Sequence, residues 1–192
     1  MSSSFAPEPA HVTELRRQLS RWVADRMPRE KRREWDKAHT WDRALFSELA
    51  EMGLIGLTIP EEYGGQGEDI YAAAAVIEEL CQGGPSMAGP FIHAAFYGGL
   101  NISENGSKEQ KETLLPKLAR GEMFLCYGLS EPNVGGDLPS VETRVTRDGD
   151  EIVINGAKRW CTGADWSDYI YCLCRSGGPE DRHGNLTFVL VP

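Results

Sequence analysis

Hydrophobic residues in the first two thirds of the chain recur at steps of three and four positions, the period of a helix with one buried face. In the first such stretch they are Val12, Leu15, Leu19 and Val23. Along the chain the pattern predicts five helices, over residues 11–27, 41–52, 70–81, 86–105 and 108–120.

Polar and helix-breaking residues set the expected ends of these helices. Pro28 ends the first one, because proline cannot continue the helical hydrogen bonding. The expected N-caps of the next four helices are Thr40, Asp69, Ser86 and Ser107. We interpret the charged run 29–37 as a solvated helix face, because acidic residues interrupt its bases.

The pattern changes after about residue 122, where short apolar runs alternate with turn residues. It predicts strands over residues 124–129, 141–147, 151–161, 169–175 and 186–191. Asp148-Gly149-Asp150 predicts a hairpin turn between the second and third of these strands.

The order of these elements predicts an α+β fold class, because no helical period separates the strands. We expect a flexible lead-in over residues 1–10 and an all-helical domain over residues 11–122. A partial antiparallel β domain, ending in mid-sheet, is expected over residues 123–192.

Composition narrows the class of protein. The chain has 192 residues, 41% of them hydrophobic, and a net charge of -9, which indicates a globular protein and argues against non-specific nucleic-acid binding. It contains neither a secretory signal nor the roughly 18 consecutive apolar residues of a membrane span. Five cysteines without a C-x-x-C motif favour a reduced, cytoplasmic protein, and four scattered histidines predict no metal site.

The segment 127–137 carries the first candidate for a functional loop, and it reads Tyr-Gly-Leu-Ser-Glu-Pro-Asn-Val-Gly-Gly-Asp. Pro132 should end the preceding strand, because proline cannot donate to a sheet ladder. At Gly135 and Gly136 the backbone can adopt φ > 0, approach a ligand closely and offer successive N–H groups to an anion. Taken alone, the segment is equally compatible with an ordinary turn between strands.

The segment 155–162, Asn-Gly-Ala-Lys-Arg-Trp-Cys-Thr, is predicted to be a strand that follows an Asn-Gly turn. Side chains alternate along a strand, so Lys158, Trp160 and Thr162 are expected on one face. An indole beside a hydroxyl suits a flat heteroaromatic ligand, and the alternative is a hairpin with a half-buried tryptophan.

Together, in this order and spacing, the two segments resemble the flavin-binding signature of the acyl-CoA dehydrogenases. Segment 56–67, with its Pro-Glu-Glu-Tyr-Gly-Gly-Gln-Gly, resembles a loop between the early helices of that family, although a flexible linker is the alternative. Segment 114–122 resembles the family's exit into its β domain. The resemblance covers residues 11–192.

The resemblance implies FAD as cofactor. It assigns cofactor contacts to Tyr127, Leu129, Ser130, Gly135, Gly136, Trp160 and Thr162. Trp160 would pack on the isoalloxazine ring, and the hydroxyls of Ser130 and Thr162 would meet the edge of that ring. Gly136 would also lie near the CoA substrate, but the family usually has serine there, so a hydrogen bond of about 0.5–1.5 kcal/mol is missing.

The resemblance further implies dehydrogenation of an acyl-CoA to a trans-2-enoyl-CoA in lipid metabolism, with electrons passed to an electron-transferring flavoprotein. No catalytic residue is expected within the chain: the family's general base is a glutamate expected beyond residue 192, and Glu131 is interpreted as structural. We expect a fragment of a homo- or hetero-oligomeric enzyme, a dimer or a tetramer and typically a homotetramer. Residues 1–192 alone are expected to be inactive and largely colourless. The alternatives are a flavin-dependent monooxygenase or nitroalkane-oxidase relative, and a non-catalytic subunit of a heteromer.

Overall fold

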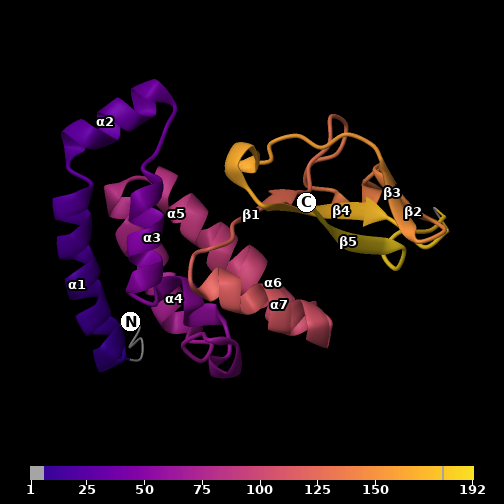
Figure 1. Ribbon diagram of the computed structural model, residues 1–192. Coiled ribbons are helices and arrows are strands. Elements are labelled where there is room, and N and C mark those ends of the chain that lie inside the picture. The colour runs from indigo at the N-terminus through magenta and orange to yellow at the C-terminus, as the bar shows by residue number, and fades with distance from the viewer. Residues whose placement is uncertain (1–6, 179) are drawn as a thin grey trace, which may run out of the picture. The chain divides into compact units, whose positions relative to one another are not determined.

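The computed structural model describes residues 7–178 and 180–192, which form two compact units divided between Met123 and Phe124 (Figure 1). Residues 1–6 of the expected lead-in lie outside the described residues, and the first helix begins at Ala10. The α+β fold class is confirmed, because the first unit is helical and the second is built on a sheet.

The first unit is helical at each of the five places that the hydrophobic period predicted, and the charged run 29–37 forms a further helix. The helices are α1 (Ala10–Arg26), α2 (Arg29–Ala38), α3 (Arg43–Glu51), α4 (Ile70–Gly83), α5 (Pro85–Ile92), α6 (Asn101–Asn105) and α7 (Lys108–Ala119). A π-helical stretch, His93–Leu100, joins α5 to α6, so the predicted helix 86–105 is continuous but not α-helical throughout. Helix α1 packs along α4, and its buried residues include Val12, Leu19 and Val23.

Side-chain caps fix two of these helix starts as predicted. The Asp69 side chain accepts a hydrogen bond from the Ala72 N–H (2.8 Å), and Ser107 forms a reciprocal capping box with Gln110.

The predicted caps at Thr40 and Ser86 differ in their outcomes. The Thr40 cap is wrong: Asp42 caps α3 by accepting from the Ala44 N–H at 3.0 Å. Aspartate caps as well as threonine does, and the later start leaves the Trp41 ring edge-to-face with Phe46 at 6.4 Å. The Ser86 side chain lies outside the described residues, and α5 starts one residue earlier, at Pro85, after Gly84.

The glycine-rich segment 56–67 is a packed turn and not a flexible linker. It includes the 3₁₀ helix Glu61–Tyr63 and the end of another, Leu54–Thr58. A Cβ atom on Gly65 would lie 1.9 Å from the carbonyl oxygen of Ile59, so the close approach of the two backbones requires glycine.

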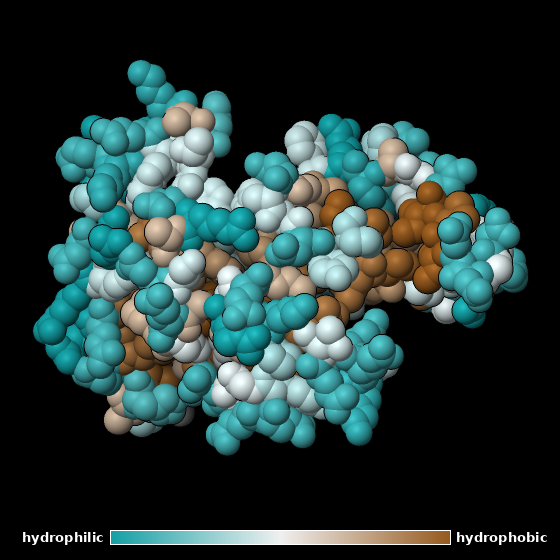
Figure 2. All heavy atoms as spheres, in the orientation of Figure 1, coloured by the Kyte–Doolittle hydropathy of each residue, from teal (hydrophilic) through white to brown (hydrophobic). Residues whose placement is uncertain are grey.

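The second unit is a five-stranded sheet. Its strands are β1 (Leu125–Gly128), β2 (Arg144–Asp148), β3 (Glu151–Asn155), β4 (Tyr169–Arg175) and β5 (Leu186–Val191). The order is β1-β4-β2-β3, with β5 also paired to β4. The β2–β3 hairpin closes at Gly149-Asp150 as predicted, and Figure 2 shows hydrophobic surface gathered over it, where Ile152 and Val153 are exposed.

The sheet is mixed, so the prediction of purely antiparallel pairing was wrong. β2–β3 and β4–β5 are antiparallel, but β1–β4 is parallel and β2–β4 meet in one parallel pair, Arg144 with Arg175. The β2–β3 hairpin intervenes along the chain between β1 and β4, and the segment after β3 returns to the start of β1. Strand β4 therefore runs in the same direction as β1.

The predicted strand 151–161 was also too long, because β3 ends at Asn155. Gly156 follows with φ 158°, and a Cβ atom there would lie 2.4 Å from Oγ1 of Thr143. The chain crosses Thr143 at this point and leaves the sheet, so Lys158, Trp160 and Thr162 do not share a strand face.

Candidate functional site

The two signature segments lie side by side in the sheet unit. The Arg159 N–H donates to the carbonyl oxygen of Ser130 at 2.9 Å. The Lys158 ammonium donates to the carbonyl oxygen of Leu129 at 3.1 Å and to Oε1 of Glu131 at 2.8 Å. Segments almost thirty positions apart in the chain are thereby held together through three consecutive residues of the first one.

Glu131 is the centre of this arrangement. Its buried carboxylate accepts from the backbone N–H groups of Glu142 (2.6 Å) and Thr143 (2.9 Å) in addition to Lys158. Its own N–H donates to the carbonyl oxygen of Val134 at 2.8 Å, which closes the turn that Pro132 begins. One side chain thus ties together the turn, the segment that leads into β2 and the Lys158 segment.

The surroundings of Glu131 keep it ionised. Burial on its own would raise the pKa of this carboxyl, but the hydrogen bonds from Lys158 and from the two backbone N–H groups outweigh burial and lower the pKa to about 2. A carboxylate with that pKa, and with its oxygens engaged, is unsuited to general acid or base chemistry near neutral pH. Its contacts within the unit are those of a structural residue.

Trp160 has an unusual backbone and an exposed ring. Its φ of 62° lies in the left-handed region, which bulky residues rarely occupy and which costs about 1–3 kcal/mol. The residue is 74% exposed, and the Arg159 guanidinium carbon lies 4.3 Å from the centroid of the indole. The fold therefore holds a large aromatic ring at the surface in a strained conformation, where ring surface is open to a ligand.

The two hydroxyl residues of the signature lie beside this tryptophan. Thr162 is exposed, and its N–H donates to the carbonyl oxygen of Trp160 at 2.9 Å. Ser130 is half-buried, and its carbonyl oxygen is bonded to the residue before Trp160. The structure thus brings Ser130, Trp160 and Thr162 into one neighbourhood by backbone hydrogen bonds, although not on the strand face that was expected.

The side chains of Tyr127 and Leu129 are occupied by packing within the unit. The Tyr127 ring lies 5.3 Å from the Tyr171 ring and 5.9 Å from the Phe188 ring. Leu129 packs against a small core cluster that includes Leu173. The backbone of these residues is engaged as well, because Tyr127 pairs with Tyr171 in the sheet and the Leu129 carbonyl oxygen accepts from Lys158.

Gly135 and Gly136 form an exposed part of the loop. Neither has positive φ, so neither uses the left-handed backbone that glycine permits. A Cβ atom at either position would meet no other atom within 4 Å. The glycines therefore leave open space above the loop and are not required by the fold of the unit.

The end of this loop borders a small cavity of about 280 Å³. It is lined by Pro139, Ser140, Arg175 and Arg182. The Asp137 carboxylate pairs with the Arg182 guanidinium and accepts from the Ser140 hydroxyl. These contacts anchor the loop where the glycine pair ends.

Arg175 is a structural residue of the site that sequence reasoning missed. It is buried at the end of β4, and its Nε donates to the carbonyl oxygen of Val141 at 3.3 Å. Its backbone N–H donates to the carbonyl oxygen of Thr143 at 2.8 Å. A single arginine after an apolar run was the available signal, because a charge rarely follows a buried strand without a partner.

The described part of the chain shows no metal cluster, no disulfide and no membrane-spanning helix. No group of three or more histidine, cysteine or acidic residues that could hold a metal ion is present there. All five cysteines are free, with the Sγ atoms of Cys172 and Cys174 3.7 Å apart. No helix among these residues combines the length and apolar content needed to cross a bilayer.

Family models of known proteins match both units of the chain. Residues 9–122 match the family model of the acyl-CoA dehydrogenase N-terminal domain, and residues 126–192 match the model of the middle domain. The chain belongs to the acyl-CoA dehydrogenase family.

The matches to individual relatives cover most of this chain but only part of each relative. It is 33% identical over 157 residues to the probable acyl-CoA dehydrogenase YngJ of Bacillus subtilis, a match that covers 82% of this chain and 41% of the relative. It is 41% identical over 147 residues to (2S)-methylsuccinyl-CoA dehydrogenase of Cereibacter sphaeroides, covering 77% of this chain and 27% of that protein. A chain of the ChsE4–ChsE5 complex from Mycobacterium tuberculosis matches with a TM-score of 0.80 and 29% identity, covering 100% of this chain and 49% of that one. The chain thus spans about half, or less, of the length of the proteins it matches.

Proposed function

We propose that the protein containing this chain is an FAD-dependent acyl-CoA dehydrogenase, which converts an acyl-CoA thioester to the trans-2-enoyl-CoA. Membership of a family that normally binds FAD supports the cofactor. The single observation that carries the proposal is Trp160, whose indole is exposed and whose backbone is strained. Backbone hydrogen bonds hold Thr162 to Trp160, and Ser130 to the residue before it.

The residues present fit a flavin. Trp160 offers aromatic surface to a flat ring, and the hydroxyls of Ser130 and Thr162 offer donors and acceptors to its polar edge. The open backbone at Gly135 and Gly136 leaves room for a phosphate or for the CoA chain. When bound, FAD supplies the acceptor for the hydride that leaves the β carbon of the acyl group.

The other residues of the candidate site hold its two segments in position. The Lys158–Glu131 pair fixes the two segments, so that Ser130 and Trp160 keep their relative places. We assign no catalytic base within residues 1–192, because the Glu131 carboxylate is committed to Lys158 and to backbone N–H groups. We propose that the base that removes the α proton lies in a part of the protein that corresponds to the region of the relatives that residues 1–192 do not match.

The partners and location belong to the same proposal. We propose a homo- or hetero-oligomer, for which the ChsE4–ChsE5 complex is a structural precedent, and an electron-transferring flavoprotein as acceptor. Reduced thiols at all five cysteines support a cytoplasmic site of action, and the acyl-CoA substrate places the reaction in lipid metabolism.

The test uses the protein expressed from its full reading frame. Its flavin absorbance is recorded without oxygen before and after addition of saturated acyl-CoAs of several chain lengths. Bleaching of the flavin with formation of an enoyl-CoA is expected. A bound flavin that no acyl-CoA reduces, or a product that forms only with oxygen, would overturn the proposal.

A further inference from the structure

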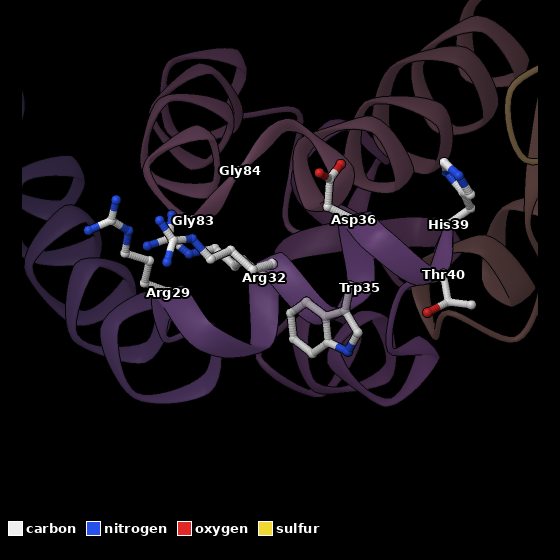
Figure 3. Close-up of a pocket in the computed structure, with 9 residues that line it drawn as sticks. Arg29, Arg32, Trp35, Asp36, His39, Thr40, Gly83 and Gly84 are labelled. Atoms are coloured by element: carbon white, nitrogen blue, oxygen red, sulfur yellow. The ribbon is translucent and has the colours of Figure 1, made fainter.

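The helical unit contains a second cavity, of about 490 Å³, that belongs to neither signature segment (Figure 3). It lies where α2 meets the junction of α4 and α5, at Gly83 and Gly84. Its volume is within the usual range for small-molecule sites, which is about 300–1,000 Å³.

The lining of this cavity is basic although the protein is acidic. Arg29, Arg32 and Arg33 line it from α2 with a single carboxylate, that of Asp36. The chain as a whole carries a net charge of -9. A local excess of positive charge in a hollow attracts anions, because the low-dielectric walls concentrate the field.

These arginines differ from Arg16 and Arg26 of helix α1 in having no salt-bridge partner among the described residues. Arg16 and Arg26 of α1 pair with Glu8 and Glu48. Across residues 7–178 and 180–192, no salt bridge forms to Arg29, Arg32 or Arg33. Three like charges that share a hollow repel one another, and the single carboxylate of Asp36 offsets that repulsion only in part, so a bound anion would relieve the rest.

Arg32 is the residue best placed to hold an anion. Figure 3 shows its side chain extending alongside that of Arg29 toward Gly83, and its Nη1 donates to the carbonyl oxygen of Gln82 at 3.0 Å. That bond anchors the side chain at the cavity, while the buried Nε has no hydrogen-bond partner in the described part of the chain. A guanidinium held at one nitrogen, with other donors unused, suits the two-pronged recognition of a phosphate group.

We propose that this cavity binds the diphosphate group of a small molecule, either as free pyrophosphate or as part of a nucleotide. Three guanidinium groups match a multiply charged anion better than a single carboxylate. The half-buried indole of Trp35 also lines the cavity and is available to a flat base, which distinguishes a nucleotide from pyrophosphate.

The test is calorimetric titration of the full-length protein, saturated with FAD, with inorganic pyrophosphate and with ADP. At least one of the two ligands should bind at submillimolar concentration, and the affinity should fall as salt is raised. Arg32→Gln and Arg29→Gln should each weaken binding about tenfold, whereas Arg144→Gln, an exposed arginine of the sheet unit, should have no effect.

Trp35→Leu separates the two sources of the diphosphate. If a nucleotide is the natural ligand, this substitution should weaken the binding of ADP and leave the binding of pyrophosphate unchanged. If pyrophosphate is the natural ligand, the substitution should change the binding of neither. Absence of binding at millimolar ligand, or binding that the Arg29 and Arg32 variants leave intact while circular dichroism shows them folded, would overturn the proposal. These outcomes do not depend on acyl-CoA oxidation, because no turnover is measured.

Discussion

The ammonium nitrogen of Lys158 lies 2.8 Å from Oε1 of Glu131, and the side chains are 10% and 2% exposed. A buried ion pair is costly to break, because removal of one partner leaves an uncompensated charge away from water. This pair joins the two segments of the candidate flavin site, so the site and the stability of the sheet unit depend on the same contact.

Replacing Lys158 with methionine should destabilise the protein by about 3–5 kcal/mol, since it leaves the Glu131 carboxylate buried and unpaired. The measurement is urea unfolding of the full-length protein. The matched control is Lys108→Met, which removes an exposed lysine from a surface pair with Glu112 and should cost less than about 1 kcal/mol. Equal effects of the two substitutions would contradict the structural role of the Lys158–Glu131 pair.

Stability should fall at acid pH through Glu131. The carboxyl has a pKa of about 2 in the folded protein and 4.5 as its ordinary value, so it favours the folded state above pH 4.5. That contribution, about 3 kcal/mol, is lost as pH falls from 4.5 toward 2. In urea unfolding across this range, the stability advantage of the native protein over Glu131→Gln should therefore shrink, and a constant difference would contradict the depressed pKa.

Two substitutions at Trp160 separate backbone strain from the role of the ring. Trp160→Gly and Trp160→Ala both remove the indole, but only glycine adopts a φ of 62° without strain. The glycine variant should therefore be more stable than the alanine variant by about 1 kcal/mol in urea unfolding. An alanine variant as stable as the glycine variant would show that the left-handed conformation is not maintained.

Gly136→Ser tests whether this glycine is a functional departure from the family pattern. No atom lies within 4 Å of the position of a Cβ there, and φ is not positive, so serine should leave the melting temperature unchanged. The added hydroxyl should tighten acyl-CoA binding by up to about 1.5 kcal/mol, measured by titration of the flavin spectrum. Gly156→Ser is the contrasting variant, since its Cβ would lie 2.4 Å from Oγ1 of Thr143, and it should be strongly destabilised. A destabilised Gly136→Ser variant would contradict the open loop.

The sequence predicted those elements whose signal is local. Strands β4 and β5 have the predicted bounds because each is a continuous apolar run, and Asp69 and Ser107 cap their helices through bonds to residues three positions away. The end of β3 could not be predicted, because Gly156 is needed for contact with Thr143 on another segment. For the same reason the parallel pairing of β1 with β4 was missed, since local pattern contains no information on strand direction.

In the candidate site, too, local features were predicted and features that depend on distant contacts were not. The residue types were recognised from the sequence, but their arrangement depends on contacts between the two segments. Lys158 was expected on a ligand-facing strand, and it is instead turned into a buried pair with Glu131. Trp160 was expected on the same face, yet it is exposed and left-handed, because the chain has already left the sheet at Gly156.

The Trp160 indole is proposed to form part of an FAD site. The most direct test of this proposal is the dissociation constant of FAD, measured by flavin fluorescence for the full-length protein and for Trp160→Gly. Tyr71→Ala, which removes a 63% exposed aromatic ring from the helical unit, is the control. We predict at least a tenfold weaker FAD affinity for Trp160→Gly and no change for Tyr71→Ala. Unchanged FAD affinity in the folded Trp160→Gly variant would contradict the account.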